Sequence, residues 1–130
     1  MGEPLILQKK TEVVLNRDVY PTLQNFPKAE KFGLCQEIKQ AFYRVLRNTM
    51  LANTSRRGDV REQRFREVDA DLKLILVLFS IAREQKYITE KKSLQLQERV
   101  SELGKITGGL IKNAQGMIKG QSSMFDSMPT

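Results

Sequence analysis

The sequence predicts an all-α protein, an antiparallel four-helix bundle with up-down-up-down connections. Apolar residues recur at intervals of three and four along four segments, which is the spacing of one helical face. The alternation of period two that marks strands is nearly absent, and no Asn-Gly or Asp-Gly hairpin turn occurs. The connections between segments are short, so consecutive helices should run antiparallel. At 130 residues the chain fits a single domain.

The first two helices are separated by prolines. The first should run from about residue 5 to residue 25, with Pro21 kinking or ending it. The second should begin near Pro27, because proline suits the first turn of a helix. Its apolar stripe is Leu34, Ile38, Ala41, Val45 and Thr49.

The third helix should begin after Gly58. We expect Asp59 to cap it, with Glu62 in the capping-box position. Residues 74–81 are apolar on most sides, and a helix of that kind is buried on more than one face. This stretch is therefore either central within the domain or turned towards another subunit. The stripe of this helix is Phe65, Val68, Leu72, Ile75, Phe79 and Ala82.

The fourth helix should follow Thr89 as its N-cap and end near Asn113. Residues 1–113 would then form the bundle, and residues 114–130, which lose the periodicity, a flexible tail. Gly104 and Gly108 lie four apart and open one face, which suits close approach by another helix, inside the bundle or across a subunit contact. The buried seam is predicted to be Leu96, Val100, Leu103, Thr107 and Leu110.

The net charge of +7 favours polyanionic partners. An antiparallel bundle gathers much of this charge at the end where the second helix meets the third, which we call the basic pole. Phosphate binding there would be salt-sensitive and directed at the backbone, while a solvated, salt-bridged face is the alternative interpretation. The scarcity of Tyr and absence of Trp argue against base-specific recognition of single strands. The candidate residues at the basic pole are Arg44, Arg47, Arg56, Arg57, Arg61, Arg64 and Lys112.

The residues needed for catalysis are scarce. There is no His, so the usual general base and the commonest metal ligand are missing, and no phosphate-binding glycine loop occurs. We therefore expect no enzyme activity, no catalytic residue, no metal and no cofactor. Cys35 is interpreted as a small core residue, and Asp69 as a partner for an arginine on a neighbouring helix. No signal peptide or membrane span is recognised, which favours a soluble cytoplasmic protein without a membrane partner.

Four elements in order carry a family resemblance: FPKAEKFGL (26–34), DADLKLIL (69–76), FSIAREQKYIT (79–89) and ELGKITGGLIK (102–112). Over about residues 5–113 the chain resembles the accessory variability determinant proteins of diversity-generating retroelements. The first element is shared with the ribosomal intervening-sequence four-helix proteins. The last element, ELGKITGGLIK, is similar to the corresponding element of the retroelement proteins and favours that branch over the ribosomal one.

The resemblance implies a pentameric barrel of four-helix bundles that binds RNA and DNA with little sequence preference. It also implies association with a reverse transcriptase and its template RNA in mutagenic cDNA synthesis, in a non-catalytic role. The family often has arginines where this chain has Leu76 and Ser80, and Arg and Trp where it has Lys105 and Leu110. We therefore expect either that the basic pole and Lys105 carry more of the binding or that contacts come from the neighbouring subunit. A protein-interaction scaffold, or an intervening-sequence-type bundle without a polymerase partner, is the alternative.

Overall fold

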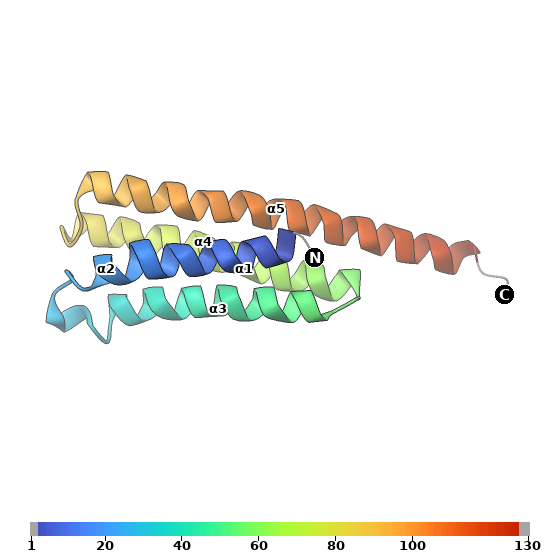
Figure 1. The fold of residues 1–130 in the computed structure, drawn as a ribbon, viewed down its shortest axis with the longest axis horizontal. Helices are drawn as coiled ribbons and strands as arrows, with labels where there is room; N and C mark the ends of the chain where they lie inside the picture. Colours follow the sequence, from blue (N-terminus) through green and yellow to red (C-terminus); the bar gives the residue numbers. More distant parts are fainter. Residues whose placement is uncertain (1–2, 128–130) are drawn as a thin grey trace.

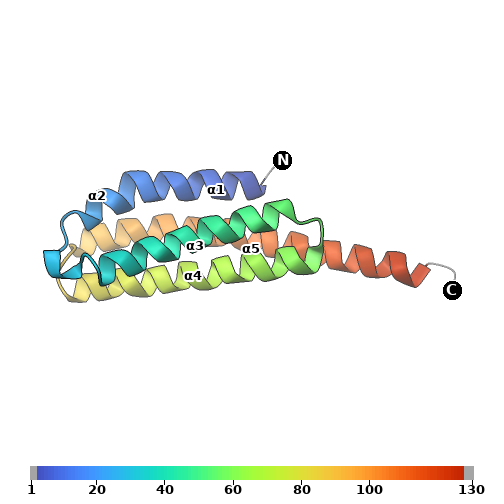
Figure 2. The same ribbon diagram turned by 90° about the horizontal axis from the view of Figure 1, so that it is seen from below.

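Four helical rods lie side by side, each antiparallel to the next along the chain (Figures 1 and 2). The computed structural model describes the backbone of residues 3–127 and the side chains of residues 5–120. Within that part of the chain no strand occurs. The prediction of an all-α four-helix bundle is confirmed. None of the described helices is long and apolar enough to cross a membrane.

The first rod contains three kinds of helical winding. The α-helix α1 (Glu3–Val13) continues as a π-helix over Val14–Val19 and then as α2 (Tyr20–Leu23). The backbone N–H of Tyr20 donates to the carbonyl oxygen of Leu15, five residues earlier. Pro21 has no N–H to donate, so the hydrogen-bond pattern has to change around it. The expected disruption at Pro21 is confirmed, and the helix ends at Leu23.

The second rod begins later than expected. Pro27 precedes a single 3₁₀ turn (Lys28–Glu30), and α3 covers Leu34–Thr54. The carboxylate of Glu30 accepts a hydrogen bond from the backbone N–H of Leu34 at 3.3 Å. The prediction of a start near Pro27 is therefore wrong. The chain uses residues 28–33 to turn back towards the bundle before α3 begins.

The third rod, α4 (Gly58–Glu84), follows a short connection from α3. Arg57 is its N-cap residue, and no side chain caps the helix end. The predicted capping box is wrong. The Asp59 carboxylate instead accepts from the Arg57 guanidinium and the N–H of Val60, and the Glu62 carboxylate accepts from Arg66. Asp59 already lies inside the helix, so it does not occupy the N-cap position from which a side chain caps the N–H groups two and three residues further on.

The fourth rod, α5 (Glu90–Ser127), has 38 residues against the 27 of α4. The hydroxyl of Thr89 accepts from the N–H of Lys92 at 3.0 Å, which confirms the predicted N-cap. The predicted end near Asn113 is wrong, because the helix runs on and projects beyond the α3–α4 turn (Figure 1). The last residues of the expected flexible tail, 128–130, lie outside the described residues.

Gly58 explains why the helix continues past Asn113. A Cβ placed on Gly58 would lie 2.9 Å from the Ala114 carbonyl oxygen, the Ile118 nitrogen and the Met117 Cβ. The bare glycine backbone thus lets the start of α4 sit directly against α5. Ala114 is buried, and the amide of Gln115 donates to Glu62 at 3.1 Å. Residues 114–118 therefore pack on the start of α4 as part of the bundle.

The core is built from the predicted stripes. The stripe residues of α4 and α5 are all buried, as are those of α3 except the half-buried Leu34. The helix α4 packs against both α3 and α5, and α1 covers the groove between α3 and α5. Cys35 is buried, as expected, and its thiol points at the carbonyl oxygen of Leu23 at 3.8 Å. The largest fully buried side chains are Phe42, Phe65 and Phe79.

One apolar face stays open to solvent. Leu74, Val77 and Ile81 of α4 are 37%, 55% and 43% exposed, so the stretch 74–81 is not central within the protomer. A Cβ built on Gly104 or Gly108 would meet no atom within 4 Å among the described residues. Internal helix packing therefore does not explain these two glycines. For both features, a contact with another subunit stays a prediction.

Candidate nucleic-acid interface

The α3–α4 turn brings several candidate arginines together. Arg56 and Arg57 lie in the connection, and Arg61 and Arg64 follow on the first turns of α4. Arg64 reaches α3, where its guanidinium donates to the side-chain carbonyl of Asn48 at 3.3 Å. Topology therefore concentrates positive charge at this end of the bundle, as expected.

Arg57 is held by an acid next to it in sequence. Its guanidinium donates to both carboxylate oxygens of Asp59, at 3.1 and 2.7 Å. This hydrogen bonding, together with the N–H of Val60, lowers the pKa of Asp59 below its usual value. Both side chains are exposed, so the pair is open to exchange with a competing phosphate.

Arg61 has a structural role that its sequence position did not reveal. Its guanidinium donates to the carbonyl oxygens of Ala52 at 3.0 Å and Ser55 at 3.4 Å, at the C-terminal end of α3. The carbonyls of a last helical turn lack intrahelical partners and carry partial negative charge. The same guanidinium lies 5.8 Å from the centroid of the Phe65 ring. Arg61 therefore joins the end of α3 to the start of α4.

The next arginines of α4 form pairs within their own helix. Arg64 lies 3.3 Å from Glu67, and Arg66 lies 3.0 Å from Glu62. Hydrogen bonds from Arg66 and then from Gln115 lower the pKa of Glu62. These contacts agree with the alternative interpretation of a salt-bridged face along α4. A nucleic-acid role for Arg57, Arg61 and Arg64 stays a prediction.

Arg44 does not lie at the basic pole. It sits near the middle of α3, where its guanidinium contacts the Asp71 carboxylate of α4 at 3.0 Å. Asp71 thus takes the part that was predicted for Asp69. Asp69 pairs instead with Lys73 on its own helix at 2.9 Å, so that prediction is wrong. Asp69 and Asp71 differ by two residues and point to different sides of the helix, and sequence spacing did not distinguish them.

The remaining candidates face solvent. Arg47, Arg56, Lys105 and Lys112 are exposed. Among the residues that the structure describes, no carboxylate lies within ion-pair distance of Arg47, Lys105 or Lys112. These three charges are available to a ligand without breaking an internal pair.

A stripe of lysines runs along α5. Lys105, Lys112 and Lys119 are seven residues apart and exposed, so they share one helical face, about 10 Å from one to the next. Gly108 and Gly116 lie on the same face, and a Cβ on either would meet no described atom within 4 Å. We call these three residues the lysine stripe. Small residues between charged ones let an extended polyanion approach the helix closely.

Lys10, unlike the lysine stripe, is paired with a carboxylate. Its ammonium lies 2.6 Å from the Glu102 carboxylate, and this contact lowers the pKa of Glu102. The structure therefore divides the predicted positive charge into paired groups and open groups. Within the described residues, no cluster of three His, Cys, Asp or Glu side chains could hold a metal ion.

Comparison with known protein families shows that the model of the bAvd-like family matches residues 5–114. This match spans most of the 130 residues. The protein belongs to the bAvd-like family. The resemblance noted in the sequence is thereby confirmed. Searches of curated proteins and of solved structures found no match. In this bAvd-like chain the matched region ends at Ala114, which is one of the α5 residues that pack on Gly58.

Proposed function

We propose that the protein is a non-catalytic accessory subunit that binds nucleic acid and associates with a retroelement reverse transcriptase and its template RNA. The observation that carries this proposal is membership of the bAvd-like family over residues 5–114. A net charge of +7, with open positive groups on α3 and α5, supports it. The protein would act in the cytoplasm.

Binding would be electrostatic. The lysine stripe and Arg47 would contact phosphates and displace condensed counterions, which requires no base recognition. Arg56 and the pairs at the α3–α4 turn would add to this surface. Because the contacts are to phosphates, RNA and DNA should bind alike.

Oligomerisation would present several such surfaces together. The exposed Leu74, Val77 and Ile81 form a helical row of the kind that a second subunit covers. The open face at Gly104 and Gly108 would allow another helix to approach. We propose a homopentamer, in keeping with the family resemblance.

The test of nucleic-acid binding is a salt titration with labelled RNA and DNA duplexes. If about six phosphates are contacted, affinity should fall by about 10³-fold or more between 50 and 200 mM salt. Arg57→Ala/Arg61→Ala/Arg64→Ala and Lys105→Gln/Lys112→Gln should each weaken both duplexes. Lys91→Gln/Lys92→Gln, at the other end of α5, removes the same charge as the lysine variant and serves as its control. Affinity that does not change with salt would refute the mechanism.

The second candidate is a protein-interaction scaffold, and the internal pairing of Arg44, Arg57 and Arg64 favours it. Co-expression with a retroelement reverse transcriptase separates the two. A co-purified complex that contains RNA supports the accessory function. A complex without RNA, from protein that shifts no duplex at low salt, supports the scaffold.

A further inference from the structure

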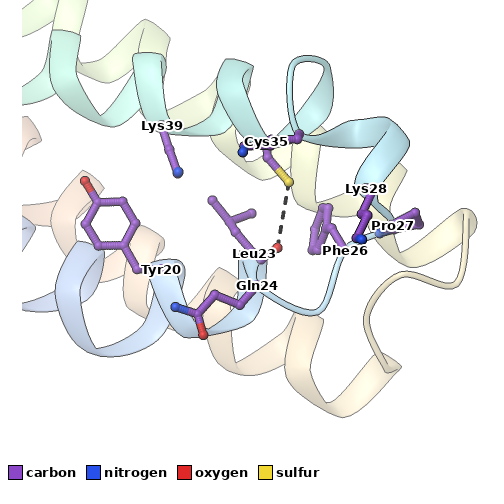
Figure 3. A pocket seen from close by; sticks show the side chains of 9 residues that line it. Tyr20, Leu23, Gln24, Phe26, Pro27, Lys28, Cys35 and Lys39 are labelled. Carbon is purple, nitrogen blue, oxygen red and sulfur yellow. Dashed lines mark hydrogen bonds between the residues drawn. The ribbon is translucent and has the colours of Figure 1, made fainter.

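A pocket lies at the end of the bundle opposite the α3–α4 turn. It has a volume of about 440 Å³ and is built where α2, the following loop, the 3₁₀ turn and α3 meet (Figure 3). The prolines that delay the start of α3 create it, because the chain makes a detour over residues 24–33 before it returns to the bundle. Pockets that take small molecules have volumes of about 300–1,000 Å³.

Three lysines line this pocket: Lys28 and Lys31 from the detour and Lys39 from α3. Among the described side chains, no carboxylate lies within ion-pair distance of any of them. Glu30 lies nearby, but its carboxylate accepts hydrogen bonds from the Tyr87 hydroxyl at 3.0 Å and the Leu34 N–H. The three lysines therefore outnumber the nearby Glu30 carboxylate, and the pocket carries a net positive charge.

The floor of the pocket is apolar and uncharged. Leu23, Phe26 and Cys35 are buried there, and Figure 3 shows Lys39 reaching from α3 towards Tyr20 and Leu23. Burial raises the pKa of the Cys35 thiol, so it stays protonated at neutral pH. The hydrogen bond with Tyr43 raises the pKa of Tyr20 to about 12. Neither group would repel an anion.

The wall adds an aromatic surface and a hydrogen-bonding group. The Lys39 ammonium lies 5.4 Å from the centroid of the Tyr20 ring, so a charge held by Lys39 is close to an aromatic face. The Gln24 amide, which can both donate and accept, lines the same pocket. This lining suits a ligand that combines an anionic group with a flat polar ring.

We propose that this pocket binds a nucleoside through its terminal phosphate monoester, with the phosphate between the lysines and the base against Tyr20 and the apolar floor. Lysine ammonium groups bind phosphate as point charges with three rotatable donors. The shared chemistry has two sources, a free mononucleotide or the phosphorylated end of a nucleic acid chain. The site is separate from the lysine stripe and does not depend on the proposed polymerase partner.

The first experiment uses the full chain and the four ribonucleoside 5′-monophosphates, each tested alone by calorimetry against its unphosphorylated nucleoside. Cys35 is the single cysteine, so its rate of alkylation gives a second readout at the pocket itself. We expect at least one monophosphate to bind and to slow alkylation, and the nucleoside to do neither. Lys39→Gln and Lys28→Gln/Lys31→Gln should each weaken binding by about 5-fold or more, the size expected for loss of a partly exposed charge contact.

The control is Lys119→Gln, which removes the same charge at the other end of the molecule and should leave mononucleotide binding unchanged. Lys39→Gln should in turn leave duplex binding unchanged, so failure of the pocket and failure of the proposed function are distinguishable. Circular dichroism of each variant shows that it is folded.

The source is then identified with a short RNA that carries either a 5′-phosphate or a 5′-hydroxyl. Protection of Cys35 by the phosphorylated RNA alone assigns the pocket to a chain end, and protection by monophosphates alone assigns it to free nucleotides. If neither monophosphates nor the phosphorylated RNA protect Cys35, or if nucleosides bind as well as their phosphates, the proposal is overturned.

Discussion

Replacing Gly58 by alanine adds one methyl group where the start of α4 touches α5. The new Cβ would lie 2.9 Å from three atoms, of which the Ala114 oxygen and the Ile118 nitrogen belong to the backbone. A backbone atom does not rotate away as a side-chain end does, so the two helices have to separate. Overpacking of this kind costs about 1–3 kcal/mol, and the loss of glycine freedom in the unfolded chain returns about 0.4–1 kcal/mol. We therefore expect a net loss of about 1–2 kcal/mol.

Urea unfolding followed by circular dichroism, at one fixed protein concentration, measures this loss. The midpoint should fall with little change in slope, and Tm should fall by roughly 4–8 °C. Gly116→Ala is the matched control, because the same methyl group would meet no described atom within 4 Å. It should raise stability by up to about 1 kcal/mol through helix propensity. If Gly58→Ala is as stable as the unmodified protein, α5 does not pack on Gly58 as described.

Two further predictions follow from the pairs at the surface. Arg61→Ala should lower the free energy of unfolding by about 1–2 kcal/mol, because it leaves carbonyls of α3 without a donor. Arg47→Ala should instead weaken duplex binding and leave stability unchanged. If urea unfolding shows that Arg47→Ala is the destabilised variant and binding assays show that only Arg61→Ala binds duplex more weakly, the roles given to the two residues are contradicted. The lowered pKa of Glu102 contributes stability that is present above the ordinary glutamate pKa of 4.5 and is lost as pH falls through the folded pKa. The Lys10→Gln variant should therefore lose less stability than the unmodified protein when pH is lowered from about 6 to 3. Carboxyl NMR should show a higher pKa for Glu102 in this variant. If the pKa of Glu102 does not change, the Lys10–Glu102 pair is contradicted.

Much of the fold is predictable because burial is periodic. Phe65, Ile75 and Leu103 lie on stripes that depend only on helical geometry, and all are buried. The helix ends were harder to predict, since they depend on single contacts. The Glu30 carboxylate bonding to the Leu34 N–H is a local contact of one side chain, and Gly58 against α5 joins two distant segments; apolar spacing reveals neither.

For the candidate site, sequence predicted the amount of positive charge but not its partners. The pairing of Arg44 with Asp71, and the contact of Arg61 with the end of α3, link residues 27 and 9 apart in sequence. Helix direction alone places such groups near one another, but side-chain reach decides which of them meet. The lysine stripe was readable in principle, because seven-residue spacing always returns to the same face. Because we expected the helix to end near Asn113, Lys119 did not fall on the same predicted helix as Lys105 and Lys112.

The projecting end of α5 has a thermodynamic consequence. An isolated short helix is marginal in water, because forming its first turn fixes several residues for a single hydrogen bond. The part of α5 beyond the contact with Gly58 does not have to nucleate a helix, because the packed part of the same helix already supplies the first turn. Each further residue needs only propagation, at a free energy close to zero for ordinary residues and unfavourable by about 1 kcal/mol for a glycine such as Gly120. The length of this extension is therefore adjustable by weak interactions, and a binding partner could lengthen or shorten it at little energetic expense.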